Sequence, residues 1–372
     1  MKEEIAEKIE RVVRLCHDQK LAGVLINTQP NFAWLTAGGS NGVDSSRENG
    51  VATLFIRSDA KRFLLANRIE VEKLLDEELR DQEYEAIDFP WEQEKANPRV
   101  AAELAQTLIA TQLPIGADLG FGEPVRMLEG EISRLRYQLT NGEIVRLREF
   151  GREAGVAISA VARSIPPGVT EREVARVTMD SLARIQAAAV VMLVAADERL
   201  KRYRHPVPKD CEWKRVLMIV VCARRGGLIV SLTRIVCVGA IPEELRHRTR
   251  ASAHVNATLF AATRPGATGS ELYRLAAAGY EQMGFRGEEK LHHQGGATGY
   301  RTRDWVAHPL STDKVLERQA FAWNPSATGS KVEETCIAFD DGIEIITSSP
   351  DWPSISVNAD GRTYELPDVL SV

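Results

Sequence analysis

The sequence predicts an α+β protein of two domains, and three of its features support that fold class. At 372 residues the chain is longer than one hydrophobic core usually supports. The first part, residues 1–138, alternates short strand-like runs with helical ones, as α/β domains do. The second part, residues 139–372, repeats a helix–turn–helix unit, which indicates an internal duplication.

The N-terminal domain begins with a predicted helix, because Ile5, Ile9, Val12 and Cys16 recur at helical spacing. Short apolar runs after it predict strands, and the stretches between some of them predict helices. The expected strands are residues 23–27, 52–57, 62–67 and 84–89, and the expected helices are 68–79 and 98–112. The connection at 128–140 is the expected domain boundary.

The second domain carries the duplication. The segment PGVTEREVAR (167–176) recurs 98 residues later as PGATGSELYR (265–274). In each copy Pro-Gly predicts a turn, and a threonine followed three residues later by glutamate predicts the start of a helix. A long amphipathic helix precedes each copy, at residues 143–163 and 243–263. Because whole helix–turn–helix units match, we interpret them as a duplication rather than as two coincident turns.

The composition argues against several classes of partner. The net charge is −5 with a pI near 5.9, so neither nucleic acid nor an anionic membrane surface is an expected partner. No apolar run approaches the roughly 18–20 residues of a membrane span, and the charged N-terminus has no apolar signal segment. The five cysteines are widely spaced, without a C-x-x-C pair. We therefore expect a reduced, cytoplasmic protein without a disulfide framework.

Several short motifs follow one another along the chain, and their order and spacing are informative. They are FAWLTAG (32–38), RHP (204–206), CARRGGLIVSLTR (222–234), HHQGGATGY (292–300), NPS (324–326) and GSKVEET (329–335). In their order and spacing the chain resembles the creatinase and aminopeptidase P (Xaa-Pro peptidase) superfamily over nearly its full length. The resemblance implies a pita-bread C-terminal domain, with duplicated helix pairs, a curved antiparallel sheet and a cleft. It also implies a homodimer, in which N-terminal residues such as Arg47 reach a partner's cleft.

The resemblance also locates the positions of metal ligands. Metal-dependent members bind two divalent ions through two Asp, one His and two Glu, and the ions activate a water and polarise the scissile carbonyl. Here those positions fall on Val220, Ser231, Gly296, Asn324 and Glu333. A single carboxylate with a hydroxyl and an amide cannot offset the dehydration of two hard cations. We therefore expect no dinuclear metal site and no cofactor.

His205 and Glu333 are the expected catalytic residues. The resemblance places His205 where creatinase has its general base and acid, and an imidazole can take a proton from water and return it to a leaving nitrogen. The alternative is a structural histidine beside Arg204. Glu333 would orient a water or bind a cationic group, or simply pair with Lys331. The expected substrate-binding residues are Ser231, Arg224, Arg234, Arg303, His292, His293 and Asn324.

Other roles for these residues stay open. Arginine forks bind carboxylates and phosphates, which allows an acidic substrate, but most arginines in proteins lie at the rim of a site or in ion pairs. Ser231 or Cys222 could act as a nucleophile with His205 as base, or merely fill space in the hairpin. His292 or His293 could replace the missing histidine ligand, three or four residues from its expected position, or line the pocket.

Three functional hypotheses follow. The leading one is a metal-independent, creatinase-like hydrolase or lyase that acts on a C–N bond of a small amidine, amide or amino-acid derivative. The second is a non-catalytic pseudo-peptidase that binds a peptide or metabolite in the altered cleft. The third is a metal-dependent Xaa-Pro peptidase, which the ligand positions disfavour.

Overall fold

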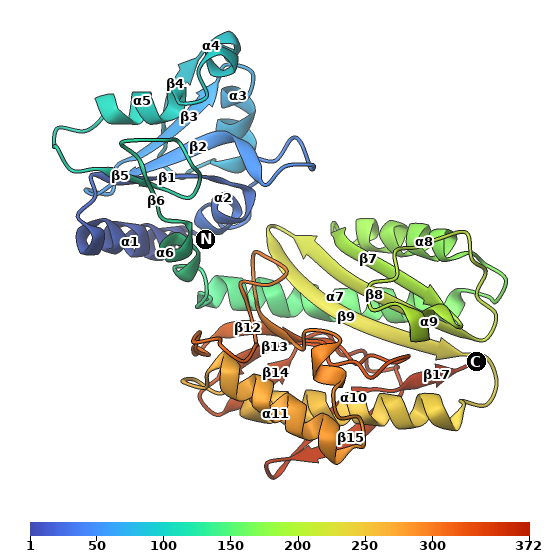
Figure 1. Ribbon diagram of the computed structural model, residues 1–372. Coiled ribbons are helices and arrows are strands. Elements are labelled where there is room, and N and C mark those ends of the chain that lie inside the picture. Colours follow the sequence, from blue (N-terminus) through green and yellow to red (C-terminus); the bar gives the residue numbers. More distant parts are fainter. The chain divides into compact units, whose positions relative to one another are not determined.

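The structure of the protein, a computed structural model, describes residues 1–372 and contains two compact units, Met1–Gly142 and Glu143–Val372 (Figure 1). The division lies a few residues beyond the expected boundary at 138/139. None of the helices is both long enough and apolar enough to cross a membrane.

The N-terminal unit is built on a six-stranded mixed sheet in the order β4-β3-β2-β1-β5-β6. Its strands are β1 (Gly23–Thr28), β2 (Asn49–Arg57), β3 (Arg62–Asn67), β4 (Glu85–Phe89), β5 (Ile115–Ala117) and β6 (Arg126–Met127). Its helices are α1 (Lys2–Gln19), α2 (Gln29–Leu35), α3 (Val71–Lys73), α4 (Trp91–Ala96), α5 (Val100–Thr107) and α6 (Glu129–Arg134), with a π-helical turn η1 (Leu74–Glu78). Phe32 and Trp34 on α2 are fully buried, so the FAWLTAG motif serves the core.

Two expected helices of this unit differ in the structure. The helix expected at 68–79 is a short α-helical turn followed by η1, and the helix expected at 98–112 ends at Thr107. Strands β5 and β6 were missed, because three and two residues are too few to show an alternating pattern.

The C-terminal unit contains two main sheets and a hairpin. The first sheet has the order β17-β9-β8-β7 and the second β11-β10-β12-β13-β14. The strands are β7 (Ala188–Ala196), β8 (Val216–Arg225), β9 (Leu228–Cys237), β10 (Gly295–Thr298), β11 (Trp305–Val306), β12 (Gln319–Trp323), β13 (Glu334–Phe339), β14 (Gly342–Ile345) and β17 (Val369–Ser371), and the hairpin is β15 (Ser354–Ala359) with β16 (Arg362–Pro367). The helices are α7 (Asn141–Ser164), α8 (Glu171–Arg184), α9 (Arg199–Arg202), α10 (Glu243–Ala262) and α11 (Gly269–Gln282), with a 3-10 turn η2 (Glu288–Lys290).

The two halves of this unit repeat one another. Helices α7 and α8 precede the β8–β9 hairpin, as α10 and α11 precede β10, β12 and β13 (Figure 1). Gly168 and Gly266, in the turns between the paired helices, have φ of 92° and 94°, a conformation that favours glycine. Gly168 donates its N–H to Trp213 O (2.8 Å) and Gly266 to Val315 O (2.9 Å). The duplicated turns therefore keep equivalent contacts.

The two main sheets meet where β9 runs beside the start of β13. The backbone N–H of Thr233 donates to Glu333 O (3.2 Å), and that of Ser231 donates to Thr335 Oγ1 (2.7 Å). Because successive side chains alternate between the faces of a strand, Thr233 and Glu333 share one face, while Arg234 and Glu334 share the other. This alternation separates two buried polar clusters.

Candidate active site

Three histidines come together from two segments of the C-terminal unit. His205 lies in the loop after α9, and His292 and His293 immediately precede β10. The Nε2 atoms of His205 and His292 are 3.1 Å apart, and the ring centroids of His292 and His293 are 4.5 Å apart. His205 is exposed, His293 is half-buried and His292 is buried. The structure thus brings these three sequence-predicted residues into one cluster.

The surroundings of the cluster favour neutral imidazoles. Burial is the main cause that lowers the pKa of each ring, and the positive charge of Lys331 adds to it. For His293, burial and the Arg303 guanidinium lower the pKa to about 4. For His205, burial and Lys331 lower the pKa, while Glu333 partly opposes them. All three rings are therefore uncharged at neutral pH.

A polar network lies next to the Nδ1 atom of His292. Ser326 Oγ lies 3.4 Å from His292 Nδ1. Arg204 donates to Ser326 Oγ (3.0 Å) and to Thr328 Oγ1 (2.7 Å), and forms an ion pair with Glu288. Arg204 of the RHP motif therefore holds together the 326–328 segment and Glu288 beside the histidines.

Glu333 is a buried carboxylate held by two cations. Its side chain is 1 % exposed, and Thr233 Oγ1 donates to its Oε2 at 2.8 Å. Lys331 Nζ lies 3.0 Å from Oε2, and Arg303 Nη2 lies 3.4 Å from Oε1. Burial by itself would raise the pKa of Glu333, but Lys331 and Arg303 outweigh it and hold the pKa below its usual range. The carboxylate is therefore ionised at neutral pH.

Lys331 is the residue of this site that sequence reasoning passed over, having considered it only as a partner for Glu333. Its side chain is 6 % exposed, and its charge lowers the pKa values of all three histidines. The alternation of Lys331 and Glu333 two residues apart was the available signal, because it places both on one face of an extended segment.

The residues at the expected ligand positions do not fit a pair of divalent ions. Val220 offers no donor atom, Ser231 is fully buried with its Oγ 3.2 Å from Cys222 Sγ, and Glu333 already has two cationic partners. The three histidines have suitable donor atoms for one transition-metal ion, all within 4.8 Å of one another. The ammonium of Lys331 beside them opposes such an ion.

Gly296, at the expected position of the histidine ligand, and its neighbour Gly295 lie where β10 packs closely against the adjacent strands. A Cβ on Gly296 would lie 2.1 Å from Trp305 O, and one on Gly295 would lie 2.1 Å from Ala322 O. Gly295 also has φ of 107°. A side chain at position 296 would therefore require β10 and β11 to move apart, and the position has no room for a metal-binding histidine.

The β8–β9 hairpin places its polar side chains in the interior. Cys222 pairs with Ser231 and Val220 with Thr233, so these four share a face. Burial raises the pKa of Cys222, and Ser231 is fully buried, so neither has the activation and access that a nucleophile needs. Arg224 lies further along the same face, paired in register with Ile229 at the hairpin end.

Arg234 does not lie on the face of β9 that carries Ser231 and Thr233, contrary to the expectation that it binds substrate. Its guanidinium is buried on the opposite face of β9, where Nη1 lies 2.7 Å from Glu334 Oε1. Nε donates to Ser159 Oγ (3.1 Å), and Nη2 donates to Thr347 O (2.9 Å). These contacts make Arg234 a structural residue that links α7, β9 and β13.

Asn324 directly follows β12 and is 3 % exposed. Its backbone N–H donates to Gln294 O (2.9 Å), which ties it to the segment that carries His292 and His293. Its side-chain Oδ1 is buried without a protein hydrogen-bond donor. A buried acceptor of this kind is suited to an N–H group of a ligand.

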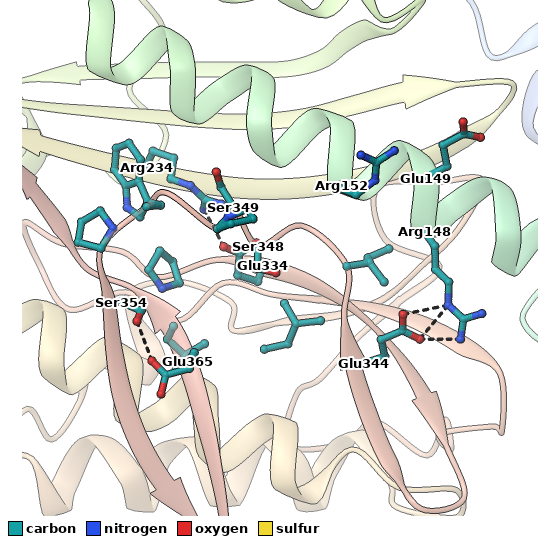
Figure 2. Close-up of a pocket in the computed structure, with 17 residues that line it drawn as sticks. Arg148, Glu149, Arg152, Arg234, Glu334, Glu344, Ser348, Ser349, Ser354 and Glu365 are labelled. Atoms are coloured by element: carbon teal, nitrogen blue, oxygen red, sulfur yellow. Dashed lines mark hydrogen bonds and ion pairs between the residues drawn. The ribbon is translucent and has the colours of Figure 1, made fainter.

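A separate cavity lies on the Arg234 side of the sheet. It has a volume of about 650 Å³ and extends between α7, the 345–350 loop and the β15–β16 hairpin (Figure 2). Most of its charged groups are already paired: Arg148 with Glu344, and Arg234 with Glu334. None of the three histidines lines it. We therefore place the candidate active site at the histidines and Glu333.

Comparisons with known proteins agree with this architecture. The model of metallopeptidase family M24 matches residues 145–347, which is more than half of the chain. The chain belongs to metallopeptidase family M24. It adopts the pita-bread fold of the creatinase and aminopeptidase P superfamily, as the sequence motifs predicted.

Individual relatives of this M24 chain are distant. It is 21% identical over 318 residues to an Xaa-Pro dipeptidase from Lactobacillus helveticus, covering 80% of this chain and 86% of the relative. The dipeptidase PepE from Mycobacterium ulcerans superimposes with a TM-score of 0.79 at 15% identity, covering 100% of this chain and 99% of that one. The N-terminal domain of FACT complex subunit SPT16 from Cicer arietinum has a TM-score of 0.70 at 12% identity, covering 94% and 97%. At these identities the structural likeness shows the fold alone.

Proposed function

We propose that the protein is a metal-independent hydrolase that cleaves a C–N bond of a small amide, amidine or amino-acid derivative. The observation that carries this proposal is the arrangement of an exposed His205 beside a buried His292, with Lys331 and Glu333 close by. Membership of family M24 supports a hydrolase of the peptidase type. The absence of a fitting set of ligands supports chemistry that the side chains carry out themselves.

His205 is the proposed general base. His292 is buried and stays neutral, so its Nδ1–H can donate to Ser326 Oγ while its Nε2 accepts the Nε2–H of His205. That arrangement leaves Nδ1 of His205 as the free basic nitrogen. When Nδ1 takes a proton, the resulting imidazolium keeps its hydrogen bond to the neutral His292. His292 is therefore a positioning residue, which orients the base.

The reaction then proceeds through addition and elimination. Water loses a proton to His205 Nδ1 as its oxygen attacks the carbonyl or amidine carbon. The C–N bond breaks, and His205 returns the proton to the leaving nitrogen. The Lys331 ammonium stabilises negative charge that develops on the attacked group, a role that a preorganised cation in a dry site performs well. Glu333 fixes Lys331 in place, and Asn324 Oδ1 accepts an N–H of the substrate.

The test is a turnover screen by mass spectrometry, with and without chelator, on Xaa-Pro dipeptides, guanidino acids and small amides. We expect turnover that survives chelation and is lost in H205A. Turnover that disappears with chelator and returns with added metal would overturn metal independence. Such a result would support a metal-dependent Xaa-Pro peptidase, the activity that the name of the Lactobacillus helveticus relative suggests.

The second candidate is a binding protein that uses the cleft without catalysis. The loss of donor atoms at Val220 and Gly296 favours it, because relaxed selection on a catalyst would produce the same changes. The two candidates differ in the role of His205. In a binding protein H205A changes ligand affinity little, and no product accumulates from any ligand that binds.

A further inference from the structure

The N-terminal unit contains a cavity at one edge of its sheet. The cavity has a volume of about 280 Å³, close to the lower end of the range of small-molecule sites. Strands β1, β3, β4 and β5 run in the same direction, so their carboxyl ends share that edge. The lining there includes Asn27 near the end of β1, Phe89 at the end of β4 and Leu119, two residues after β5.

The cavity lies where the connections of the sheet diverge. In the order β4-β3-β2-β1-β5-β6 the chain leaves β1 towards β2 on one side, and it returns from β4 to β5 on the other. Helix α5, which precedes β5, covers one face of the sheet, whereas α1 and α2 lie on the opposite face (Figure 1). In open α/β sheets ligands bind outside the carboxyl ends of the strands at such a point. The topology therefore marks the same place as the cavity.

The inner wall of the cavity carries neutral hydrogen-bonding groups. Asn27 faces the same side of the sheet as Leu25, which packs against α5. Its Nδ2 donates to Thr53 Oγ1 (2.9 Å) and to Ala52 O (3.2 Å), at an irregularity in the β1–β2 pairing. Asn27 is 7 % exposed, and its Oδ1 has no protein donor. Thr53 Oγ1 accepts this one hydrogen bond and donates none within the protein. An unused acceptor therefore lies next to an unused donor.

The rest of the cavity suits a flat, uncharged ring. Leu65, Phe89 and Phe121 are buried apolar residues of its lining. A Cβ added to Gly120 would meet nothing within 4 Å, so the loop after β5 leaves space beside them. None of the charged residues of the lining is buried; they are Arg47, Glu94 and Lys95. A ligand group in the buried part therefore has to be neutral, because no buried charge is present to pair with it.

We infer that this cavity binds a neutral heterocyclic base, either free or as a nucleoside. The base donates an N–H to Asn27 Oδ1 and accepts a hydrogen bond from the Thr53 hydroxyl, while the apolar residues cover its faces. Nucleobases offer a donor beside an acceptor on one edge, and proteins read such an edge by hydrogen bonds together with apolar packing on the ring. The site lies within the N-terminal unit, so the inference does not depend on the proposed hydrolase.

The probes are adenine and adenosine, each compared with the derivative in which two methyl groups replace the exocyclic N–H hydrogens. Isothermal titration calorimetry of the full chain measures the dissociation constants. We expect binding at millimolar or lower concentrations, and about fivefold weaker binding of the methylated derivative, because it loses one hydrogen bond. Tighter binding of adenosine than of adenine identifies a nucleoside as the ligand, and the reverse order identifies the free base. No binding of either, or equal affinity for the methylated derivative, overturns the inference.

Variants test whether the base occupies this cavity. G120L fills the free space with a side chain and should abolish binding. G130L is the matched control, because Gly130 is an exposed residue of α6 whose added Cβ also meets nothing within 4 Å, and it should bind with unchanged affinity. T53V keeps the shape of the side chain but removes its O–H, so it should bind about fivefold more weakly. Unchanged affinity in G120L or in T53V contradicts the inference.

H205A separates this site from the histidine cluster of the C-terminal unit. It removes an imidazole of that cluster and leaves the N-terminal unit unaltered, so it should bind the base as tightly as the unaltered protein. Loss of binding in H205A places the base at the histidines and overturns the inference.

Discussion

Lys331 and Glu333 are joined by a 3.0 Å contact between Nζ and Oε2, and both side chains are almost fully buried. Glu333 is the one carboxylate that remains at the five expected metal-ligand positions. The ammonium therefore contacts the carboxylate that would otherwise bind a metal ion. This pairing explains how an ionised carboxylate is tolerated in the interior.

Removing Lys331 alone is predicted to destabilise the protein, because it leaves the buried Glu333 carboxylate without its nearest cation. K331M leaves the Glu333 carboxylate buried with only the more distant Arg303, so we expect a loss of about 3–5 kcal/mol in the free energy of unfolding. Urea denaturation measures this loss. The double variant K331M/E333Q removes the buried charge and should recover most of the stability. A single variant as stable as the unaltered protein would show that Arg303 suffices.

The catalytic rate is predicted to fall at acidic pH. Burial and Lys331 lower the pKa of His205 below 6.5, and the proposed base works only when it is unprotonated. The pH profile of kcat/KM should therefore stay high at neutral pH and decline through a midpoint below 6.5. K331M should move that midpoint upward, and H205A should lose roughly 10²–10⁴-fold in rate. A midpoint above 6.5 argues against His205 as the base.

Stability is also predicted to fall in acid, through the buried histidines. His293 has a pKa of about 4 in the folded protein and an ordinary value of 6.5. The unfolded chain therefore binds the proton first, and stability is lost as the pH falls from 6.5 towards about 4, by up to about 3 kcal/mol. H293Q should flatten this slope in urea titrations at several pH values. His292, whose pKa is also lowered, should leave a residual slope in that variant.

The glycine at position 296 is predicted to be irreplaceable. In G296A the Cβ would lie 2.1 Å from the backbone oxygen of Trp305, so we expect a loss of about 2 kcal/mol or more. Gly120, whose added Cβ would meet nothing within 4 Å, gives the control variant G120A. For the same reason G296H should not create a metal site, and elemental analysis should find no stoichiometric metal in it. Stable, metal-loaded G296H would contradict this account of the strand spacing.

Predictions from the sequence succeeded where they rested on local patterns. The repeated Pro-Gly turns predicted the paired helices α7–α8 and α10–α11, because a turn and a helix start depend on a few adjacent residues. The motif order predicted the pita-bread fold. The shorter elements β5, β6 and η1 were missed or misassigned, because few residues leave no periodic signal.

The roles of the arginines required the tertiary structure. Arg234 and Arg303 both seemed suitable for binding a substrate from the sequence. Arg234 instead pairs with Glu334 on the far face of β9, while Arg303 reaches Glu333 from the segment after β10. Residue type and spacing do not reveal which face of a sheet a partner from a distant strand will cover.

The sequence by itself determined the family and the duplicated architecture, since these depend on residue identities and their order. The tertiary structure alone decided that His205, His292 and His293 form one cluster, and that Lys331 and Arg303 share the Glu333 carboxylate. The reason is physical: a buried charge is tolerated only beside its partners, and those partners come from segments that the fold brings together.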